Sequence, residues 1–96
     1  MRGRHRLAPS DYGFYAALGK AIREIREAQG MTQDALAQHL SLTRTSLVNI
    51  EQGRQHVRLH TLMLIAQGLG VPYWSFIPEH AMPKPRVKVH LPLEEP

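Results

Sequence analysis

The most constraining feature of this sequence is the connector Ser41-Leu42, two residues between two short stretches of helical periodicity. Thr32 and Thr43 stand just before these stretches, where a threonine hydroxyl can cap the first turn of a helix. The second stretch stops at Gly53, a residue typical of helix C-termini. A connector this short forces two helices to cross at a large angle, so the pattern predicts a helix-turn-helix.

Apolar residues recur at helical spacing in five stretches, which glycine or proline residues separate. The expected helices run from a cap at Ser10 or Asp11 to Gly30, from Thr32 over about two turns, from Thr43 to Gly53, from about Arg58 to Gly70, and from Tyr73 to Ile77. Residues 86–91 alternate and are β-branched, which is typical of a short strand. We therefore expect an all-α domain over 11–78, a flexible basic arm at 1–10, and an extended tail at 79–96.

Composition narrows the class of protein. The chain has 96 residues, which indicates one domain, and its lack of cysteine excludes disulfides, thiolate zinc sites and cysteine nucleophiles. No apolar run reaches the ~18 residues of a membrane helix, and the N-terminus has no apolar signal region, so we expect a cytoplasmic protein without membrane contact. A net charge of +4 and a pI near 10.0 favour a polyanionic partner such as nucleic acid.

The histidines do not indicate a metal site. His56 and His60 have the spacing of a helical zinc pair, but His56 precedes the expected helix and no third ligand is evident. No combination of serine, histidine and aspartate stands out either. We expect no bound metal, no cofactor and no enzymatic activity.

The stretch 43–52 is expected to expose polar side chains of the kinds that contact DNA bases. Leu47 and Ile50 are expected to face the core, which leaves Gln52 and the four candidate base readers outside, namely Arg44, Thr45, Val48 and Asn49. Arginine can donate two hydrogen bonds to guanine, asparagine can pair with adenine, and the methyl groups of threonine or valine can touch thymine. Val48 remains open between such a contact and a simple exposed apolar residue. Base readers in the first half of a helix are typical of a recognition helix in the DNA major groove.

Around this helix lie side chains suited to phosphate groups: Gln33, Thr43, Gln52, Arg54 and Arg58. Phosphate contacts fix the register of a protein on DNA, while base contacts specify sequence. The arginines of the arm MRGRHR remain open between a solvated end and a contact with the minor groove or with phosphates.

The stretches MTQDALAQHLSLTRTSLVNIEQGRQ at 31–55 and LHTLMLIAQGLGV at 59–71 carry a family pattern. Over about residues 15–77 the chain resembles the phage-repressor-like, or Cro/C1-type (XRE), helix-turn-helix regulators. The resemblance implies a five-helix lambda-repressor-like domain that binds double-stranded DNA, usually as a dimer. By position it implies base reading by Arg44, Thr45 and Asn49, and phosphate contacts by Gln33, Thr43 and Gln52. It also implies an ion pair between Arg26 and Glu51 that joins the first helix to the third.

Two positions depart from the family pattern. Ser41 stands where glycine is usual, so we expect either a strained φ or an adjusted turn. Val57-Arg58 replaces a usual Pro-Ser pair before the fourth helix, which weakens the cap but adds a cation.

The sequence therefore predicts a sequence-specific transcriptional regulator, an (auto)repressor that binds a palindromic operator as a dimer through the helix at 43–52. Tyr73, Trp74 and Phe76 are candidates for the dimer interface, because the short fifth helix carries more aromatic surface than its own core needs. The tail remains open between a dimer contact, packing on its own domain, and disorder. The alternatives are an antitoxin that neutralises a toxin, a protein-interaction module that keeps the fold without binding DNA, or a repressor of a defence or prophage operon that a partner protein or peptidase controls.

Overall fold

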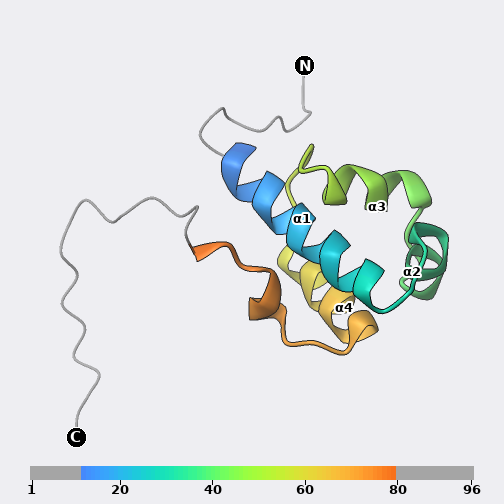
Figure 1. Ribbon diagram of the computed structural model, residues 1–96. Coiled ribbons are helices and arrows are strands. Elements are labelled where there is room, and N and C mark those ends of the chain that lie inside the picture. The colour runs from blue at the N-terminus through green and yellow to red at the C-terminus, as the bar shows by residue number, and fades with distance from the viewer. Residues whose placement is uncertain (1–11, 80–96) are drawn as a thin grey trace, which may run out of the picture.

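The computed structural model describes residues 12–79, and the architecture of this part is all-helical, with no strand among these residues. Four α-helices are followed by a single 3₁₀ turn (Figure 1). In chain order they are α1 (Tyr12–Ala28), α2 (Gln33–His39), α3 (Arg44–Glu51), α4 (Leu59–Leu69) and η2 (Tyr73–Phe76). The predicted arm at 1–10 and the possible strand at 86–91 lie outside the described residues.

Side-chain caps set the starts of the two central helices, as the sequence predicts. The Thr32 hydroxyl accepts a hydrogen bond from the Ala35 N–H at 3.0 Å, and the Thr43 hydroxyl accepts one from the Ser46 N–H at 3.0 Å. Helix α4 differs, because the Arg58 side chain makes no capping hydrogen bond with the described residues. The weak cap expected from Val57-Arg58 is therefore present.

The prediction of a fifth α-helix at Tyr73–Ile77 was wrong. The chain makes a single 3₁₀ turn over Tyr73–Phe76, so the described residues contain four α-helices rather than five. Pro72 and Pro78 leave five residues between them, which is too short for the cooperative gain that follows helix nucleation. The turn is held by packing instead, since the Phe76 side chain is fully buried.

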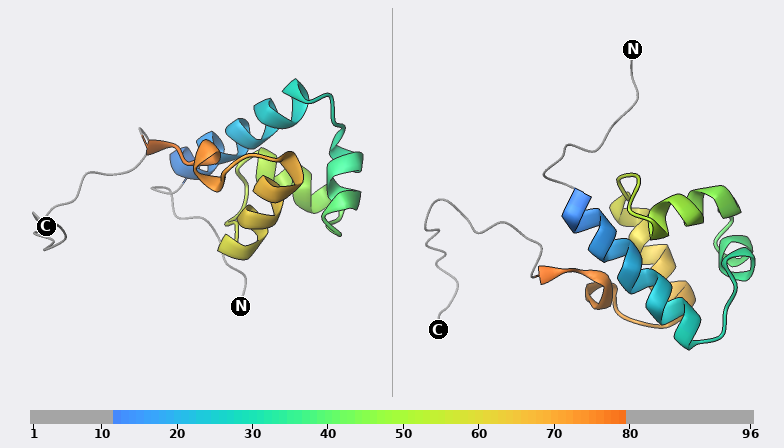
Figure 2. Two further views of the ribbon diagram at one scale, coloured as in Figure 1. Left: turned by 90° about the horizontal axis from the view of Figure 1, so that it is seen from below. Right: turned by 45° about the horizontal axis from the view of Figure 1, so that its top comes forward.

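One apolar core joins all five elements, and α1 contributes one buried side to it. The buried apolar residues are Leu18, Ile22, Leu36, Ala37, Leu47, Ile50, Leu62, Ile65, Ala66, Leu69 and Phe76. Helix α3 and the turn η2 lie on opposite sides of α1 (Figures 1 and 2). The domain therefore has two separate faces, one built on α3 and the other on α4 and η2.

Helix α3 packs unusually close to α1, and two glycines permit this. A Cβ on Gly19 would overlap the carbonyl oxygen of Ile50 and lie 2.5 Å from that of Glu51. Gly53 ends α3 with φ +71°, and a Cβ there would lie 2.6 Å from the Cα of Ala16. Both contacts are with backbone atoms, which cannot move aside easily. Small residues at these positions therefore fix the height of α3 above α1.

The turn between α2 and α3 adopts the strained geometry expected from its sequence. Ser41 has φ 58°, the left-handed region that a residue with a Cβ rarely occupies. The next residue, Leu42, donates its N–H to the carbonyl of Ala37 at 2.9 Å, which closes the turn. Ala37 is buried, and its small side chain suits the close crossing of the two helices.

Candidate nucleic-acid interface

The outer face of α3 carries the four side chains that the sequence assigns to base reading. Leu47 and Ile50 are buried and hold the opposite side of the helix in the core. Arg44 and Thr45 at its start are exposed, while Val48 and Asn49 are half-buried. These side chains belong to the first six residues of one helix, so a single insertion of α3 can present them together.

Arg44 is paired with an acidic residue of the preceding helix. Its Nε lies 3.5 Å from Oδ1 of Asp34, and both side chains are well exposed. The sequence does not predict this pair, because Asp34 and Arg44 belong to different helices and helical spacing relates only residues of one helix. Asp34 belongs to the first turn of α2, and the tight turn between the helices brings it beside the start of α3.

Asn49 is also held by a neighbour. The guanidinium of Arg54 donates from Nη1 to Oδ1 of Asn49 at 3.3 Å, and the Arg54 N–H donates to the Asn49 carbonyl at 2.9 Å. A guanidinium has no acceptor, so only the oxygen end of the amide can face it. The NH₂ group of Asn49 therefore remains available as a donor. Arg54, predicted to contact phosphate, lies against a predicted base reader.

Below this face lies a buried ion pair between Arg26 of α1 and Glu51 of α3. Nε of Arg26 donates to Oε2 of Glu51 at 2.6 Å, and Nη2 donates to Oε1 at 3.0 Å. Nη1 donates to the Met31 carbonyl at 2.6 Å. The hydrogen bond with Glu51 raises the pKa of Arg26 above its ordinary value, and burial opposes this effect. The guanidinium therefore keeps its charge, and the last turn of α3 is fixed to α1.

Gln33 extends this network to α2. Its Nε2 donates to Oε1 of Glu51 at 3.0 Å, so the first residue of α2 is bonded to the last residue of α3. A carboxylate only accepts hydrogen bonds, which means that the NH₂ end of Gln33 must face it. One N–H of that group is left for a phosphate. The predicted phosphate residue thus has a second role in joining the two helices.

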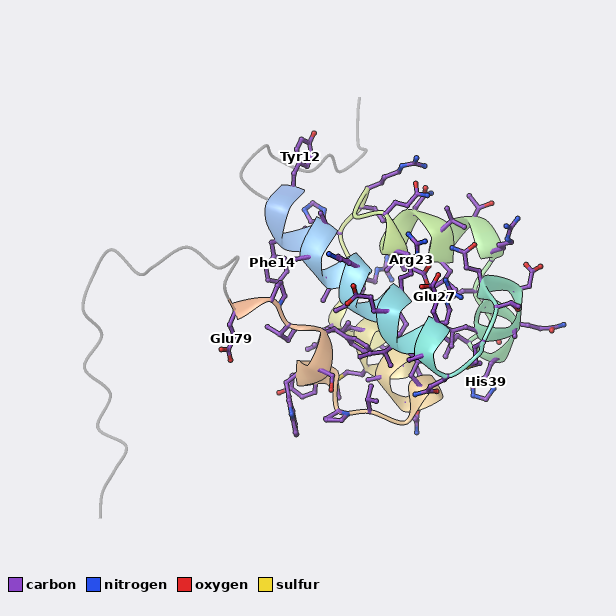
Figure 3. All side chains as sticks on the ribbon, viewed as in Figure 1. Tyr12, Phe14, Arg23, Glu27, His39 and Glu79 are labelled. Atoms are coloured by element: carbon purple, nitrogen blue, oxygen red, sulfur yellow. The ribbon has the colours of Figure 1, made fainter. Side chains whose placement is uncertain are left out.

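A polar hollow of about 250 Å³ opens above this network, between α1, α2 and α3. Its lining is formed by Arg23, Arg26, Glu27, Gln33, Glu51 and Gln52. Arg23 donates from Nε to Glu27 at 3.1 Å, and both side chains lie on the side of α1 that is turned toward α3 (Figure 3). Gln33 and Gln52, both predicted to contact phosphate, therefore share the rim of one hollow.

The remaining predicted phosphate contacts, Thr43 and Arg58, lie at the starts of α3 and α4. The Thr43 hydroxyl is already engaged, because it accepts from the Ser46 N–H and donates to Oγ of Ser46 at 3.0 Å. Arg58 is exposed at the end of the loop that begins with Arg54. This loop is attached to α1 by a ring contact between His56 and Tyr15, whose centroids are 5.2 Å apart.

The face built on α4 and η2 has a different character. Leu59 and Trp74 are 69% and 65% exposed, and Met63 and Tyr73 are exposed as well. A shallow apolar groove between α4 and η2 includes Met63, Tyr73 and Trp74 in its lining. Of the three dimer candidates, Tyr73 and Trp74 therefore lie at the surface, whereas Phe76 is a core residue with 0% exposure.

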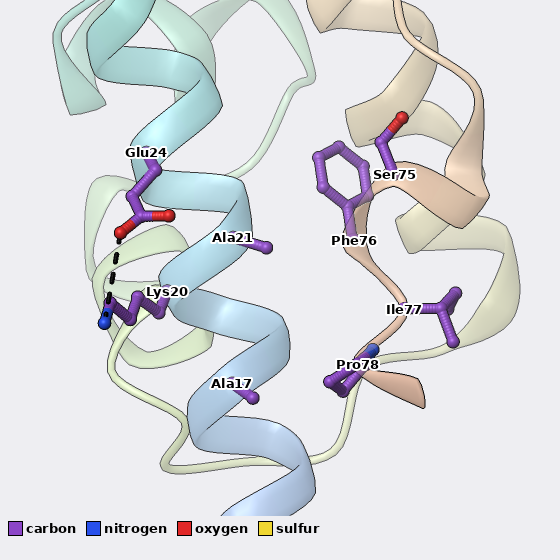
Figure 4. Close-up of a pocket in the computed structure, with 8 residues that line it drawn as sticks. All are labelled: Ala17, Lys20, Ala21, Glu24, Ser75, Phe76, Ile77 and Pro78. Atoms are coloured by element: carbon purple, nitrogen blue, oxygen red, sulfur yellow. Dashed lines mark ion pairs between the residues drawn. The ribbon is translucent and has the colours of Figure 1, made fainter. Parts of the chain in front are cut away.

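A second hollow lies between α1 and η2. Ala17 and Ala21 of α1 face Phe76, Ile77 and Pro78 across it, and its volume is about 340 Å³ (Figure 4). The exposed pair Lys20 and Glu24, with a Nζ–Oε2 distance of 4.0 Å, lies at its edge. This hollow is lined by residues of η2, and η2 lies on the side of α1 that faces away from α3 (Figures 1 and 2).

Among residues 12–79 there is no group of three or more histidine or acidic side chains that could hold a metal ion. His56 precedes α4, as the sequence predicts, while His60 lies within it. Within the same range, no helix is both long and apolar enough to cross a membrane.

The close crossing of α2 and α3, with polar side chains on the outer face of α3, is the arrangement of a DNA-binding helix-turn-helix domain. Residues 22–73 match the helix-turn-helix family HTH_3, and the chain belongs to this family of XRE-type transcription regulators. The family resemblance seen in the sequence is therefore confirmed.

Individual relatives are regulators as well. The chain is 33% identical over 67 residues to the immunity repressor protein of Bacillus phage phi105, which covers 70% of this chain and 46% of that repressor. The chain thus spans about half the length of this relative. The fold of the present chain is similar to that of the restriction-modification controller protein C.AhdI from Aeromonas hydrophila, with a TM-score of 0.64 and 27% identity. The similarity covers 66% of this chain and 96% of the controller.

A further solved structure, an HTH_3 family transcriptional regulator from Vibrio cholerae, has a TM-score of 0.65 and 29% identity. The similarity covers 69% of this chain and 37% of the Vibrio protein. These relatives are transcription regulators and not enzymes.

Proposed function

We propose that the protein is a sequence-specific repressor that binds a palindromic operator as a dimer and controls its own promoter. The observation that supports this proposal most strongly is the way α3 is anchored to the rest of the domain. Its last residue is held by the buried Arg26–Glu51 pair and by Gln33, while its outer face keeps polar side chains that match base edges. A buried network that fixes an exposed polar helix is expected where the angle of that helix matters.

In the proposed complex, α3 enters the major groove with its N-terminal half toward the bases. Arg44 donates two hydrogen bonds to guanine, and Asn49 contacts adenine or another base with an acceptor edge. Thr45 and Val48 offer methyl groups for a thymine contact. Val48 is half-buried, so part of its side chain remains accessible for such a contact.

The phosphate contacts are assigned to the residues that flank α3. Gln33 and Gln52 act from the polar hollow, and Arg54 and Arg58 act from the loop after α3. Thr43 is placed beside a phosphate at the start of the helix, where its hydroxyl would turn from Oγ of Ser46 to donate to the phosphate. Because Arg54 and Arg58 approach phosphates in each of the two protomers, affinity is expected to fall as salt increases.

The dimer is assigned to the face of α4 and η2. Exposed aromatic side chains beside an apolar groove are typical of protein interfaces, and Trp74 and Tyr73 supply them here. The two copies of α3 would then enter the major groove about 34 Å apart, on one face of the duplex. A dimer bound there blocks polymerase, and the protein acts in the cytoplasm where the promoter is.

The first experiment is binding of the full chain to the DNA upstream of its own gene and to a scrambled duplex of equal composition, across a salt series. Strong preference for the upstream DNA, with an affinity that falls as salt increases, is expected. Equal weak affinity for both duplexes would overturn autorepression. Footprinting of the preferred duplex then tests the palindrome, since a dimer protects two symmetric half-sites.

A second candidate is the control of a defence or prophage operon. It is favoured by the similarity to a phage immunity repressor and to a restriction-modification controller. In this case a neighbouring gene product, such as a toxin or a peptidase, is expected to change the output of the promoter. A promoter fusion measured with and without the neighbouring gene separates this candidate from simple autorepression.

A further inference from the structure

Asp34 is an unexpected residue on a surface that faces DNA. Within α2 and α3, which the structure describes in full, the acidic residues are Asp34 and Glu51, and the Glu51 side chain is only 1% exposed. Asp34 is therefore the one exposed carboxylate of the two helices, at 77%. A carboxylate near phosphates opposes general affinity for DNA, because like charges repel.

The position of this carboxylate is specific. Its Oδ1 lies 3.5 Å from Nε of Arg44, which the proposed function assigns to base reading. Nε is on the side of the guanidinium, and the two terminal nitrogens, Nη1 and Nη2, form the fork that matches O6 and N7 of guanine. A carboxylate at Nε therefore leaves the fork available for a base.

Arg44 has other partners within reach once DNA is present. A free arginine at the start of a recognition helix can turn toward the phosphate backbone, where it adds affinity without sequence preference. Asp34 acts against this movement in two ways, because it attracts the guanidinium at Nε and repels the phosphates that compete for it.

We propose that Asp34 is a specificity-determining residue that holds Arg44 toward the base edge and away from phosphates. This inference rests on the proposed function of α3. Asp34 touches no base itself and is a positioning residue. Because exposed ion pairs are weak, its effect is a bias in the ratio of specific to non-specific binding rather than a loss of fold.

A structural role alone predicts something different. An acidic residue in the first turn stabilises a helix through the helix dipole, and Asp34 is in the first turn of α2. That role concerns thermal stability and does not involve Arg44. Binding measurements with and without Arg44 therefore separate the two roles.

The test compares the full-length protein with Asp34→Asn, on its selected operator and on a scrambled duplex. Asp34→Asn is expected to bind scrambled DNA about fivefold tighter, and its salt slope should steepen by about 0.9, the value for one additional phosphate contact. The ratio of operator to scrambled affinity should fall correspondingly. Asp34→Glu, which keeps the charge, should retain the wild-type ratio.

The control for charge is Glu24→Gln, which alters another exposed acidic residue, on α1, whose partner is Lys20. It changes net charge by the same amount and should leave the ratio unchanged. The background control is Arg44→Ala, in which Asp34→Asn should no longer steepen the salt slope. The inference is overturned if Glu24→Gln matches Asp34→Asn, or if Asp34→Asn has the same effect without Arg44.

The two proposals fail in different ways. If the wild type binds operator and scrambled DNA equally, the proposal of sequence-specific repression is wrong. The difference in salt slope between the wild type and Asp34→Asn on scrambled DNA still tests whether Asp34 keeps Arg44 away from phosphates. If the wild type discriminates and Asp34→Asn discriminates equally well, the role of Asp34 alone is wrong. Thermal melts of each variant confirm that the binding differences do not come from unfolding.

Discussion

The two faces of this domain are built on opposite principles. On the face of α3, exposed polar side chains are tied to neighbours: Arg44 to Asp34, and Asn49 to Arg54. On the face of α4 and η2, large apolar side chains such as Trp74 and Leu59 are exposed beside a groove that has no such polar ties among its described residues. The polar side chains of the first face have neighbours that bias their orientation, while the second face exposes apolar surface.

In the proposed complex the two faces have different tasks, because the face of α3 contacts base edges and the face of α4 and η2 contacts the second protomer. Directional hydrogen bonds suit the discrimination of base edges, because a misplaced donor loses its partner. Apolar burial is non-directional and suits association with a second protein surface. Since α3 and η2 lie on opposite sides of α1, a substitution on one face is expected to leave the other intact (Figure 1).

The largest effect is expected from Glu51→Ala, which removes the carboxylate beneath the α3 face. Arg26 would then be a buried charge without its partner, and such a loss costs about 3–5 kcal/mol of unfolding free energy. Urea denaturation measures this loss. The control is Glu24→Ala, whose exposed pair with Lys20 is worth about 0–1 kcal/mol. Equal losses in the two variants would contradict the anchoring of α3 by Glu51.

The close approach of α3 to α1 is tested by comparing Gly53→Ala with Gly30→Ala. Both glycines have positive φ, at +71° and +73°, and each alanine is therefore expected to cost about 1–2 kcal/mol. A Cβ at Gly53 also meets the backbone of Ala16, whereas a Cβ at Gly30 has no described atom within 4 Å. Gly53→Ala should therefore be the more destabilising in thermal unfolding, and equal melting temperatures would contradict the close contact.

On the reading face, Asn49→Ala should relax preference at one base pair by about 1–3 kcal/mol. Binding to a set of operators, each with one base pair changed, measures this. Self-association should not change, because Asn49 is remote from η2. The assignment fails if the variant keeps the wild-type ratio of specific to scrambled binding at every position.

On the apolar face, Trp74→Ser should weaken self-association by about 1 kcal/mol or more, as for a buried aromatic residue of an interface. Sedimentation equilibrium measures the change. Tyr12→Ser, which alters another exposed aromatic residue at the start of α1, is the control. An unchanged association constant for Trp74→Ser would remove this face from the dimer interface.

The smallest effect is expected at the turn that sets the tilt of α3. Ser41→Gly removes the cost of a Cβ at φ 58°, so unfolding free energy should rise by about 0.5–1 kcal/mol. The gain is read from the denaturation midpoint. A loss of stability would mean that the serine makes a compensating interaction in the turn.

The sequence was sufficient for features that depend on local chemistry. The threonine caps of α2 and α3, the two-residue turn and the strain at Ser41 follow from residue type and position along one helix or turn. The side of α3 that faces the core follows from its periodicity, since Leu47 and Ile50 are both buried.

The sequence was not sufficient where side chains meet across elements. The ion pair of Asp34 with Arg44 and the hydrogen bonds of Arg54 with Asn49 and of Gln33 with Glu51 each join residues that do not share a helix, so the periodicity within one helix does not apply to them. The prediction of a fifth α-helix was wrong for a related reason. Its apolar residues have the right spacing, but the prolines on both sides and the burial of Phe76 allow only one tight turn.

The bond between Gln33 and Glu51 has a mechanical consequence. It joins the beginning of α2 to the end of α3, and Arg26 joins the same carboxylate to α1, so the three helices move as one stiff body. A stiff body cannot adjust its curvature to the groove it enters. In the proposed complex the duplex must therefore bend or twist to fit, and the cost of that deformation depends on base steps that the protein never touches. Part of the operator preference is then expected to reside in the flexibility of the DNA between the two half-sites.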